Sequence, residues 1–246
     1  MSHYNVALIR RPYQDADEML AKYSERLEVK PYIRLSRKDA LKEAAETIAK
    51  YADGTYKNSS NNWGEKLAKA KETSEDELIK VYAAYCGREL DENGNQLSTY
   101  NPLSKYDYYG ETETFDTLSE YIKKYPAYAS KHKIYKARVL WRHVVEGKPL
   151  PKKFEKDEYF QYHHSKKYYL EKYGDIKLFI RMIVSNVPAY AFVLDGEWYS
   201  PGEVGMFAAE AVSGVEETKK YLDVWENIQK DPQLLNSELI IYDMHI

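Results

Sequence analysis

The two ends of the chain carry apolar segments that resemble strands, and helices, turns and loops fill most of the sequence between them. Residues 3–11, "HYNVALIRR", are mostly aliphatic with polar flanks, and residues 237–246, "SELIIYDMHI", are more strongly apolar. A strand needs a hydrogen-bonded neighbour. We therefore expect both segments to lie in one sheet, with the first of them in its middle.

Two dipeptides between these ends are strong hairpin signals. Asn93-Gly94 lies in "DENGNQLSTY", and Asp195-Gly196 lies in "PAYAFVLDGEWYSPG". Strands at both ends with hairpins between them favour an α+β fold on a mostly antiparallel sheet over a regular alternation of strands and helices. We predict one domain over residues 1–246, with helical insertions at about 61–87 and 114–174.

Capping residues mark the clearest helices. Ser36 opens a helix that Gly54 ends, and Thr73 or Ser74 opens another that Gly87 ends. Residues 28–36, "EVKPYIRLS", lead up to the first of these helices and are predicted to be extended, because Pro31 disfavours helix at the residue before it. Residues 131–151 are a basic stretch that ends in a proline-bounded turn. Helices are also predicted at 15–27, 114–125, 156–174 and 214–232.

Charge and composition exclude several classes of protein. The net charge is −3, with 36 Lys and Arg residues against 39 Asp and Glu residues, so we expect no long nucleic acid as a partner. The N-terminus lacks a signal-peptide pattern, and no apolar stretch approaches the roughly 20 residues that a spanning helix needs. The single cysteine, Cys86, is interpreted as a buried thiol. We expect a cytoplasmic protein without a membrane partner.

Common catalytic and metal-binding motifs are absent from the sequence. It contains no glycine-rich phosphate loop and no Gly-x-Ser-x-Gly. The six histidines lack the spacing of zinc ligands. We therefore predict no catalytic residue, no metal and no cofactor.

A basic and aromatic cluster surrounds His163 and His164. Lysines and tyrosines follow directly, in "HHSKKYY". Such a cluster can neutralise phosphates while its rings stack on bases. It can equally be the solvated face of a helix whose tyrosines point inward, and we favour this second interpretation.

Tyrosine is unusually frequent, with 25 residues against 6 phenylalanines. Its ring is apolar and its tip polar, which suits pockets and interfaces. The bias can also mean that tyrosine replaces phenylalanine in the core. Its density is high in residues 97–110, "LSTYNPLSKYDYYG", directly after the turn sequence "DENGN".

This segment resembles the signature of a family of mostly uncharacterised proteins from tailed bacteriophages and other mobile elements. That signature reads Tyr-Asn-Pro-x-Ser/Ala-Lys-Trp-Asp-Trp-Tyr and is followed by Ile-Gly-Gly-Arg-Trp. The opening "YNVALIRRPYQDADEMLAKYSERLEVKPYI", the turn "DENGNQLSTYNP" and the closing pieces "AFVLDGEWYSPGEVG" and "IIYDMHI" resemble the family as well. Tyr106 and Tyr108 replace its tryptophans, and "GETETF" replaces its Gly-Gly-Arg-Trp.

The resemblance and the residue types together predict a ligand-binding site. In it, tyrosines form an aromatic wall, Lys105 and Asp107 supply polar contacts, and an Asn-Pro turn aims them. The alternative is a tyrosine-rich hairpin packed under a helix. The predicted ligand-binding residues are Tyr100, Asn101, Lys105, Tyr106, Asp107, Tyr108, Tyr109, Trp198 and Glu203.

The predicted function is that of a phage accessory protein that acts by binding. The resemblance implies a homo-oligomer that sequesters a nucleotide-derived immune signal of the host, because stacking rings with lysine contacts suit a nucleotide. Two alternatives remain open. One is a protein–protein inhibitor of a host defence protein. The other is a nucleotide-processing enzyme with Asp107, Glu203 or His245 as acid or base.

Overall fold

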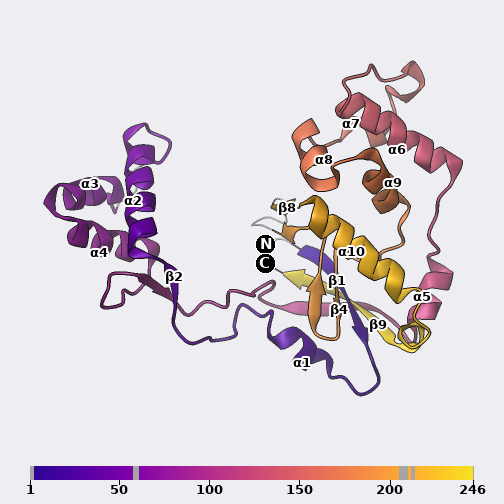
Figure 1. The fold of residues 1–246 in the computed structure, drawn as a ribbon, viewed down its shortest axis with the longest axis horizontal. Helices are drawn as coiled ribbons and strands as arrows, with labels where there is room; N and C mark the ends of the chain where they lie inside the picture. The colour runs from indigo at the N-terminus through magenta and orange to yellow at the C-terminus, as the bar shows by residue number, and fades with distance from the viewer. Residues whose placement is uncertain (1–2, 58–60, 205–209, 212–213, 246) are drawn as a thin grey trace. The chain divides into compact units, whose positions relative to one another are not determined.

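The chain forms two compact units. The computed structural model describes residues 3–57, 61–204, 210–211 and 214–245, without the side chains of 203–204 and 210–211 (Figure 1). The sheet unit combines Met1–Glu25 with Leu103–Ile246, and the insert unit is Arg26–Pro102. The helices predicted at about 61–87 fall in the insert unit, and those predicted at about 114–174 fall in the sheet unit.

A five-stranded sheet is the centre of the sheet unit in the described part of the chain. Its order is β4-β9-β1-β5-β6, with β1 parallel to β5 and every other pair antiparallel. The predicted α+β fold on a mostly antiparallel sheet with both terminal strands is confirmed. The strands are β1 His3–Arg10, β4 Tyr109–Phe115, β5 Ala191–Leu194, β6 Glu197–Tyr199 and β9 Glu238–His245.

Both faces of this sheet are buried. Ala7 and Ile9 of β1 face one hydrophobic core, and Val6 and Leu8 face the other. Helices α5 (Leu118–Lys124) and α10 (Val215–Ile228) cover the first face, where Trp225 is fully buried. Helix α1 (Ala16–Ala21) covers the second face. Because residues on both sides are buried, β1 is apolar at consecutive positions rather than at alternate ones.

Four further helices form a group with its own core. They are α6 Lys131–Val144, α7 Glu158–Gln161, α8 Lys166–Tyr173 and α9 Ile176–Val184, and we call them the helical group. Trp141, Tyr169 and Phe179 lie in their shared core. Leu178 and Met182 of α9 contact both this core and the core under α10, so α9 joins the group to the sheet. Figure 1 shows the group beside α10 and away from α1.

The prediction of one helix over 156–174 is wrong. Residues 162–165 are not helical, and the chain forms α7 before them and α8 after them. Ser165 has extended backbone angles, and its hydroxyl accepts a hydrogen bond from the amide of Tyr168 at 3.3 Å. This N-cap starts a new helix, because it satisfies an amide that has no partner inside the helix.

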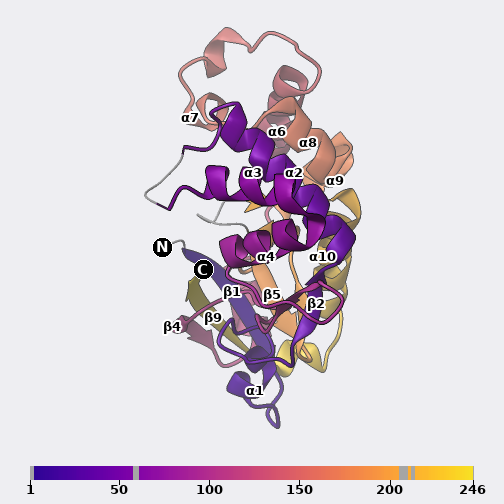
Figure 2. The same cartoon turned by 90° about the vertical axis from the view of Figure 1, so that its left-hand side faces the viewer.

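The insert unit holds three helices and a two-stranded sheet in its described part. Ser36 caps α2 (Arg37–Ala52), Ser74 caps α4 (Glu75–Cys86), and Gly87 follows α4 with a φ of +63°, as predicted. Figures 1 and 2 show α2 and α4 beside α3 (Trp63–Thr73). Strand β2 (Tyr32–Leu35) pairs with β3 (Gln96–Ser98), and the predicted turn at Asn93-Gly94 precedes β3.

Candidate functional site

Residues 97–110, which we call the signature segment, are divided between the two units. Tyr100 and Asn101 belong to the insert unit, whereas Lys105 and the three tyrosines after it belong to the sheet unit. Tyr100 is about half exposed and Asn101 is buried. Each part of the segment therefore has its own surroundings.

Tyr106 is a buried structural residue. Its hydroxyl donates a hydrogen bond to the carbonyl of Leu20 at 3.0 Å, and its own carbonyl accepts one from the amide of Glu25 at 2.8 Å. Burial, and after it the charge of Asp17, raises the pKa of Tyr106 to about 12. The residue ties the segment to the chain around α1, and it lines neither of the two cavities described below.

Tyr109 and Tyr4 extend this buried cluster. The hydroxyl of Tyr109 donates to the carboxylate of Asp17, and its ring meets that of Tyr106 edge-on at 5.2 Å. Burial first and the hydrogen bond to Asp17 second raise the pKa of Tyr109. The hydroxyl of Tyr4 donates to the carbonyl of Lys105. These contacts use the polar tips of the tyrosines to fasten the segment to the sheet.

A cluster of imidazole and phenol groups lies where β1 begins and β9 ends. The hydroxyl of Tyr108 is 2.6 Å from Nε2 of His245, and the two rings stack at 3.9 Å. His3 meets His245 edge-on at 3.8 Å, and its Nδ1 is 2.9 Å from the carboxylate of Asp243. The carboxylate of Asp107 accepts the amide of Tyr108 at 2.6 Å. Such groups can exchange protons with a ligand, but no described cavity reaches them.

A cavity lies beside the edge strand β6, and we call it the Trp198 cavity. Its volume is about 660 Å³, within the range of small-molecule sites. Trp198 packs with the core of one sheet face and Tyr199 with the core of the other, so the cavity lies at the edge of the sheet. Its lining residues are Tyr23, Leu103, Lys105, Glu197, Trp198, Tyr199, Ser200, Gly202, Gly214, Glu217, Lys220 and Tyr221.

The aromatic rings of this cavity are held in fixed positions. The rings of Tyr23 and Trp198 are 5.1 Å apart, and Tyr199 stacks on Phe192 at 5.1 Å. The hydroxyl of Tyr23 donates to the carbonyl of Gly196 at 2.9 Å. The hydroxyl of Tyr221 is held in the same way by a backbone carbonyl at 2.6 Å. A planar ligand would thus meet rings that need no rearrangement.

Two lysines and two glutamates supply the charge of the cavity. Nζ of Lys220 lies 5.7 Å from the centre of the Tyr199 ring, and Lys105 lines the wall beside Trp198. Glu197 pairs with Lys22 at 2.8 Å, and this hydrogen bond lowers the pKa of the glutamate. One of the two acidic groups is therefore already neutralised from outside the cavity.

Helix α10 begins at the wall of the cavity. Gly214 is its N-cap and makes no side-chain cap, as glycine has none to offer. The carboxylate of Glu217 folds back over this end, since a Cβ added to Gly214 would lie 2.0 Å from its Oε2. A helix N-terminus attracts anions. Glu217 now occupies this position, and a ligand phosphate would have to displace it.

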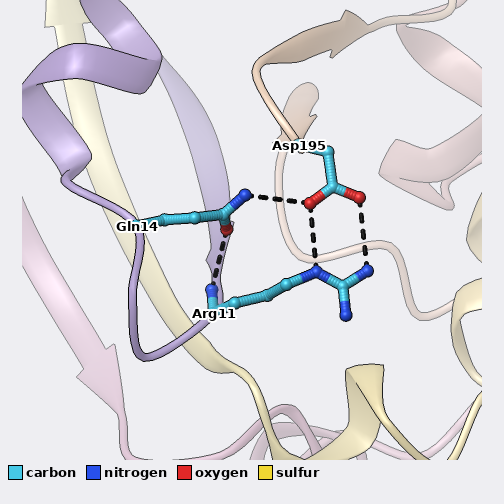
Figure 3. Close-up of polar contacts among 3 residues, drawn as sticks. All are labelled: Arg11, Gln14 and Asp195. Atoms are coloured by element: carbon cyan, nitrogen blue, oxygen red, sulfur yellow. Dashed lines mark hydrogen bonds and ion pairs between the residues drawn. The ribbon is translucent and has the colours of Figure 1, made fainter.

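Polar contacts fix the hairpin that carries Trp198. Figure 3 shows Arg11 bound to both carboxylate oxygens of Asp195, at 3.1 and 3.2 Å, and Gln14 donating to the same carboxylate at 2.9 Å. The hydrogen bond from Arg11 is the main cause that lowers the pKa of Asp195. Asp195 and Gly196 have φ of +50° and +75°, which confirms the predicted turn. The turn and its anchor set the position of β6.

The insert unit has a cavity of its own, of about 510 Å³. Arg34, Arg88 and Tyr100 line it together with Cys86. Cys86 is partly buried, and burial raises the pKa of its thiol. A thiol with a raised pKa is a poor nucleophile at neutral pH.

The predicted site residues are thus only partly brought together. Lys105 and Trp198 line the same cavity, Tyr100 lines the cavity of the insert unit, and the remaining signature tyrosines do not line either. The backbone of Glu203 lies in β7 (Glu203–Val204), paired with β8 (Glu210–Ala211), and its side chain is outside the described part. Sequence reasoning missed the other ten residues that line the Trp198 cavity, among them Tyr23, Tyr199, Lys220 and Tyr221.

The described residues contain no group of three His, Cys, Asp or Glu side chains placed to hold a metal ion. No helix among them has the length and apolar character to cross a bilayer. Comparisons of the chain with protein families, curated proteins and solved structures find no match. The resemblance to the phage family therefore stays a prediction.

Proposed function

We propose that the sheet unit binds a small anionic ligand with a planar ring, such as a nucleotide-derived signal, in the Trp198 cavity. One observation carries the proposal: aromatic rings and two lysines line a single cavity of nucleotide-compatible size. The ring of the ligand would stack on Trp198, and its phosphate would approach Lys105 and Lys220.

Binding without chemical conversion is the activity that this arrangement favours. Among the described residues, no histidine and no cysteine lines the cavity, and the glutamates that line it are exposed. A sequestering protein needs only affinity and an amount comparable to that of its ligand. Together with the resemblance of residues 100–109, this supports a phage protein that removes a host immune signal in the cytoplasm, as a homo-oligomer.

Ligand capture followed by mass spectrometry tests the proposal. The purified chain would be incubated with a library of mono-, di- and cyclic nucleotides, freed of unbound material and denatured. We expect an intact nucleotide to be released. A chemically altered nucleotide would show catalysis, and release of nothing from any pool would contradict the proposal.

A matched pair of lysine variants tests the location of the site. Lys220→Gln removes a cation that lines the cavity, while Lys219→Gln removes its exposed neighbour, which does not line it. We expect the first to weaken affinity for the captured nucleotide about tenfold or more, as expected for loss of a charged contact, and the second to change it less than about twofold. Equal losses in both variants would place the ligand elsewhere.

A further inference from the structure

The positive charge of the protein is concentrated in the helical group. Residues 131–184 contain 14 lysines and arginines against 6 aspartates and glutamates, a difference of +8. Because the whole chain carries −3, all other residues together carry −11. The near-neutral total therefore hides a strongly basic region on one part of the sheet unit.

One face of α6 presents this charge to solvent in a regular order. Lys131, Tyr135, Arg138 and Arg142 are all exposed and follow one another at intervals of three or four residues, so they lie on one face of the helix. The opposite face, with Ala137 and Leu140, is buried against the core of the group. We call the exposed row the α6 stripe.

The cations of the α6 stripe are not used by the fold. In the described part of residues 131–184, the cations that form ion pairs include Lys136, Lys148, Lys167 and Arg181. Lys131, Arg138 and Arg142 have no carboxylate within ion-pair distance there. An exposed row of unneutralised cations costs stability through repulsion, which points to an anionic partner.

Exposed rings lie among these cations. Tyr135 is 42% exposed, and Nζ of Lys153 lies 4.8 Å from the centre of its ring. In the last turn of α6, the ring of His143 meets that of His163 at 5.8 Å, and the neighbouring Tyr162 is 84% exposed. His163 and Tyr162 lie in the break between α7 and α8, which the prediction of a continuous helix did not foresee.

We propose that the α6 stripe, with Lys153 and the break at residues 162–165, binds single-stranded nucleic acid. Cations one or two helical turns apart can follow a phosphate backbone, and exposed rings can stack on unpaired bases. Bases of a duplex are already stacked and are closed to such rings. The expectation that no long nucleic acid binds rested on the net charge, which averages over two oppositely charged regions.

Fluorescence anisotropy with the full chain tests this inference. The probes are fluorescein-labelled oligo(dT) and oligo(U) of about 15 nucleotides, titrated at increasing NaCl concentrations. We expect binding that weakens with salt. Arg138→Gln with Arg142→Gln should weaken it at least about tenfold and reduce the slope of log affinity against log salt by about 1.4, at about 0.7 per lost phosphate contact. Tyr135→Ala should weaken binding with the slope unchanged.

A matched control separates a local site from general charge. Lys38→Gln with Lys42→Gln removes two exposed cations at the same spacing from α2 of the insert unit. This variant should bind like the unmodified chain, and so should Lys220→Gln, because its cavity is a separate site. Circular dichroism of every variant checks that the fold is kept.

Four results would overturn the inference. They are absence of binding at low salt, equal loss in the α2 control, tighter binding of a duplex of the same length, and displacement of the oligonucleotide by polyglutamate or anionic lipid vesicles as readily as by unlabelled oligonucleotide. The last result would mean that the stripe recognises charge alone.

Discussion

Two regions of the molecule are rich in tyrosine, and they use it in opposite ways. In the signature segment, the hydroxyls of Tyr106 and Tyr109 are bound to a carbonyl and a carboxylate of the region around α1. In the helical group, Tyr135 and Tyr162 lie exposed, and a lysine or a histidine stands beside them. Tyrosine density is thus a poor guide to a binding surface, and the partner of the hydroxyl is a better one.

The chemistry of the phenol explains the difference. A buried hydroxyl must find an acceptor, and the loop or strand that supplies it is fixed in the process. An exposed hydroxyl can bond to water instead, and its ring keeps some surface that a ligand can contact, as the Tyr135 ring does beside Lys153 and Phe154. The signature segment shows the first use, and the α6 stripe shows the second.

Removal of one ring from each region gives the largest expected contrast. Tyr106→Ala should lower the free energy of unfolding by about 3–5 kcal/mol, as for other large buried rings, because Tyr106 fills the core between α1 and the sheet. Tyr135→Ala should change it by about 0.5 kcal/mol or less. Urea denaturation measures both. Similar losses at the two positions would remove the distinction between the regions.

Removal of the hydroxyl alone should have a smaller effect that depends on pH. Tyr106→Phe keeps the ring and loses the bond to Leu20, at a cost of about 1 kcal/mol at neutral pH. The pKa of Tyr106 is about 12 in the folded protein and about 10 when unfolded. This raised pKa favours folding below pH 10, and the contribution is lost as the pH rises towards 12. The difference in free energy of unfolding between the unmodified protein and Tyr106→Phe should therefore narrow as the pH rises from 10 towards 12. A difference that stays constant over this pH range would argue against burial of the hydroxyl.

The hairpin of Trp198 should give the smallest effect, because its anchor is partly exposed. Asp195→Asn keeps a residue that tolerates a positive φ and should cost about 0.5 kcal/mol at neutral pH. The lowered pKa of Asp195 favours folding above about pH 4, and this contribution is lost as the pH falls through the lowered pKa. The cost of the substitution should therefore vanish in acid. A double-mutant cycle of Asp195→Asn with Arg11→Gln measures the coupling energy of the pair drawn in Figure 3. A coupling energy of zero would contradict a role of this pair in holding the hairpin.

The fold could be predicted where local signals agree with the tertiary structure. The aliphatic runs of β1 and β9 identified the sheet, and Ser36, Ser74 and Gly87 marked helix ends. Helix α6 was not assigned, because its exposed face is basic and its buried positions are spread through that charge. The break before α8 was missed because its residues are compatible with a helix, and only the cap at Ser165 separates the two.

The candidate site could be predicted only in part, because it combines distant segments. Lys105 and Trp198 stand out in the sequence, and both line the Trp198 cavity. Tyr23 and Lys220 reach it only because β6 pairs with β5 and because α1 and α10 pack on opposite faces of the sheet. No local sequence pattern predicts that residues so far apart in the chain line the same cavity. The high tyrosine content of residues 97–110 likewise led to the prediction of a binding site, because the sequence does not show which hydroxyls are buried. In the structure, the hydroxyls of Tyr106 and Tyr109 mainly fasten this segment to the region around α1.

The pairing of β1 with β9 has a consequence for how the protein is made. These strands pair along their whole length, although Arg10 and Glu238 are 228 residues apart. On the ribosome, β1 therefore emerges long before its partner, and an unpaired strand with two apolar faces is exposed to aggregation. The insert unit is continuous over Arg26–Pro102, so all the residues of its core are synthesised before Leu103 and the rest of the sheet unit. We expect it to fold during translation, while the sheet closes last and β1 needs protection by a chaperone until then.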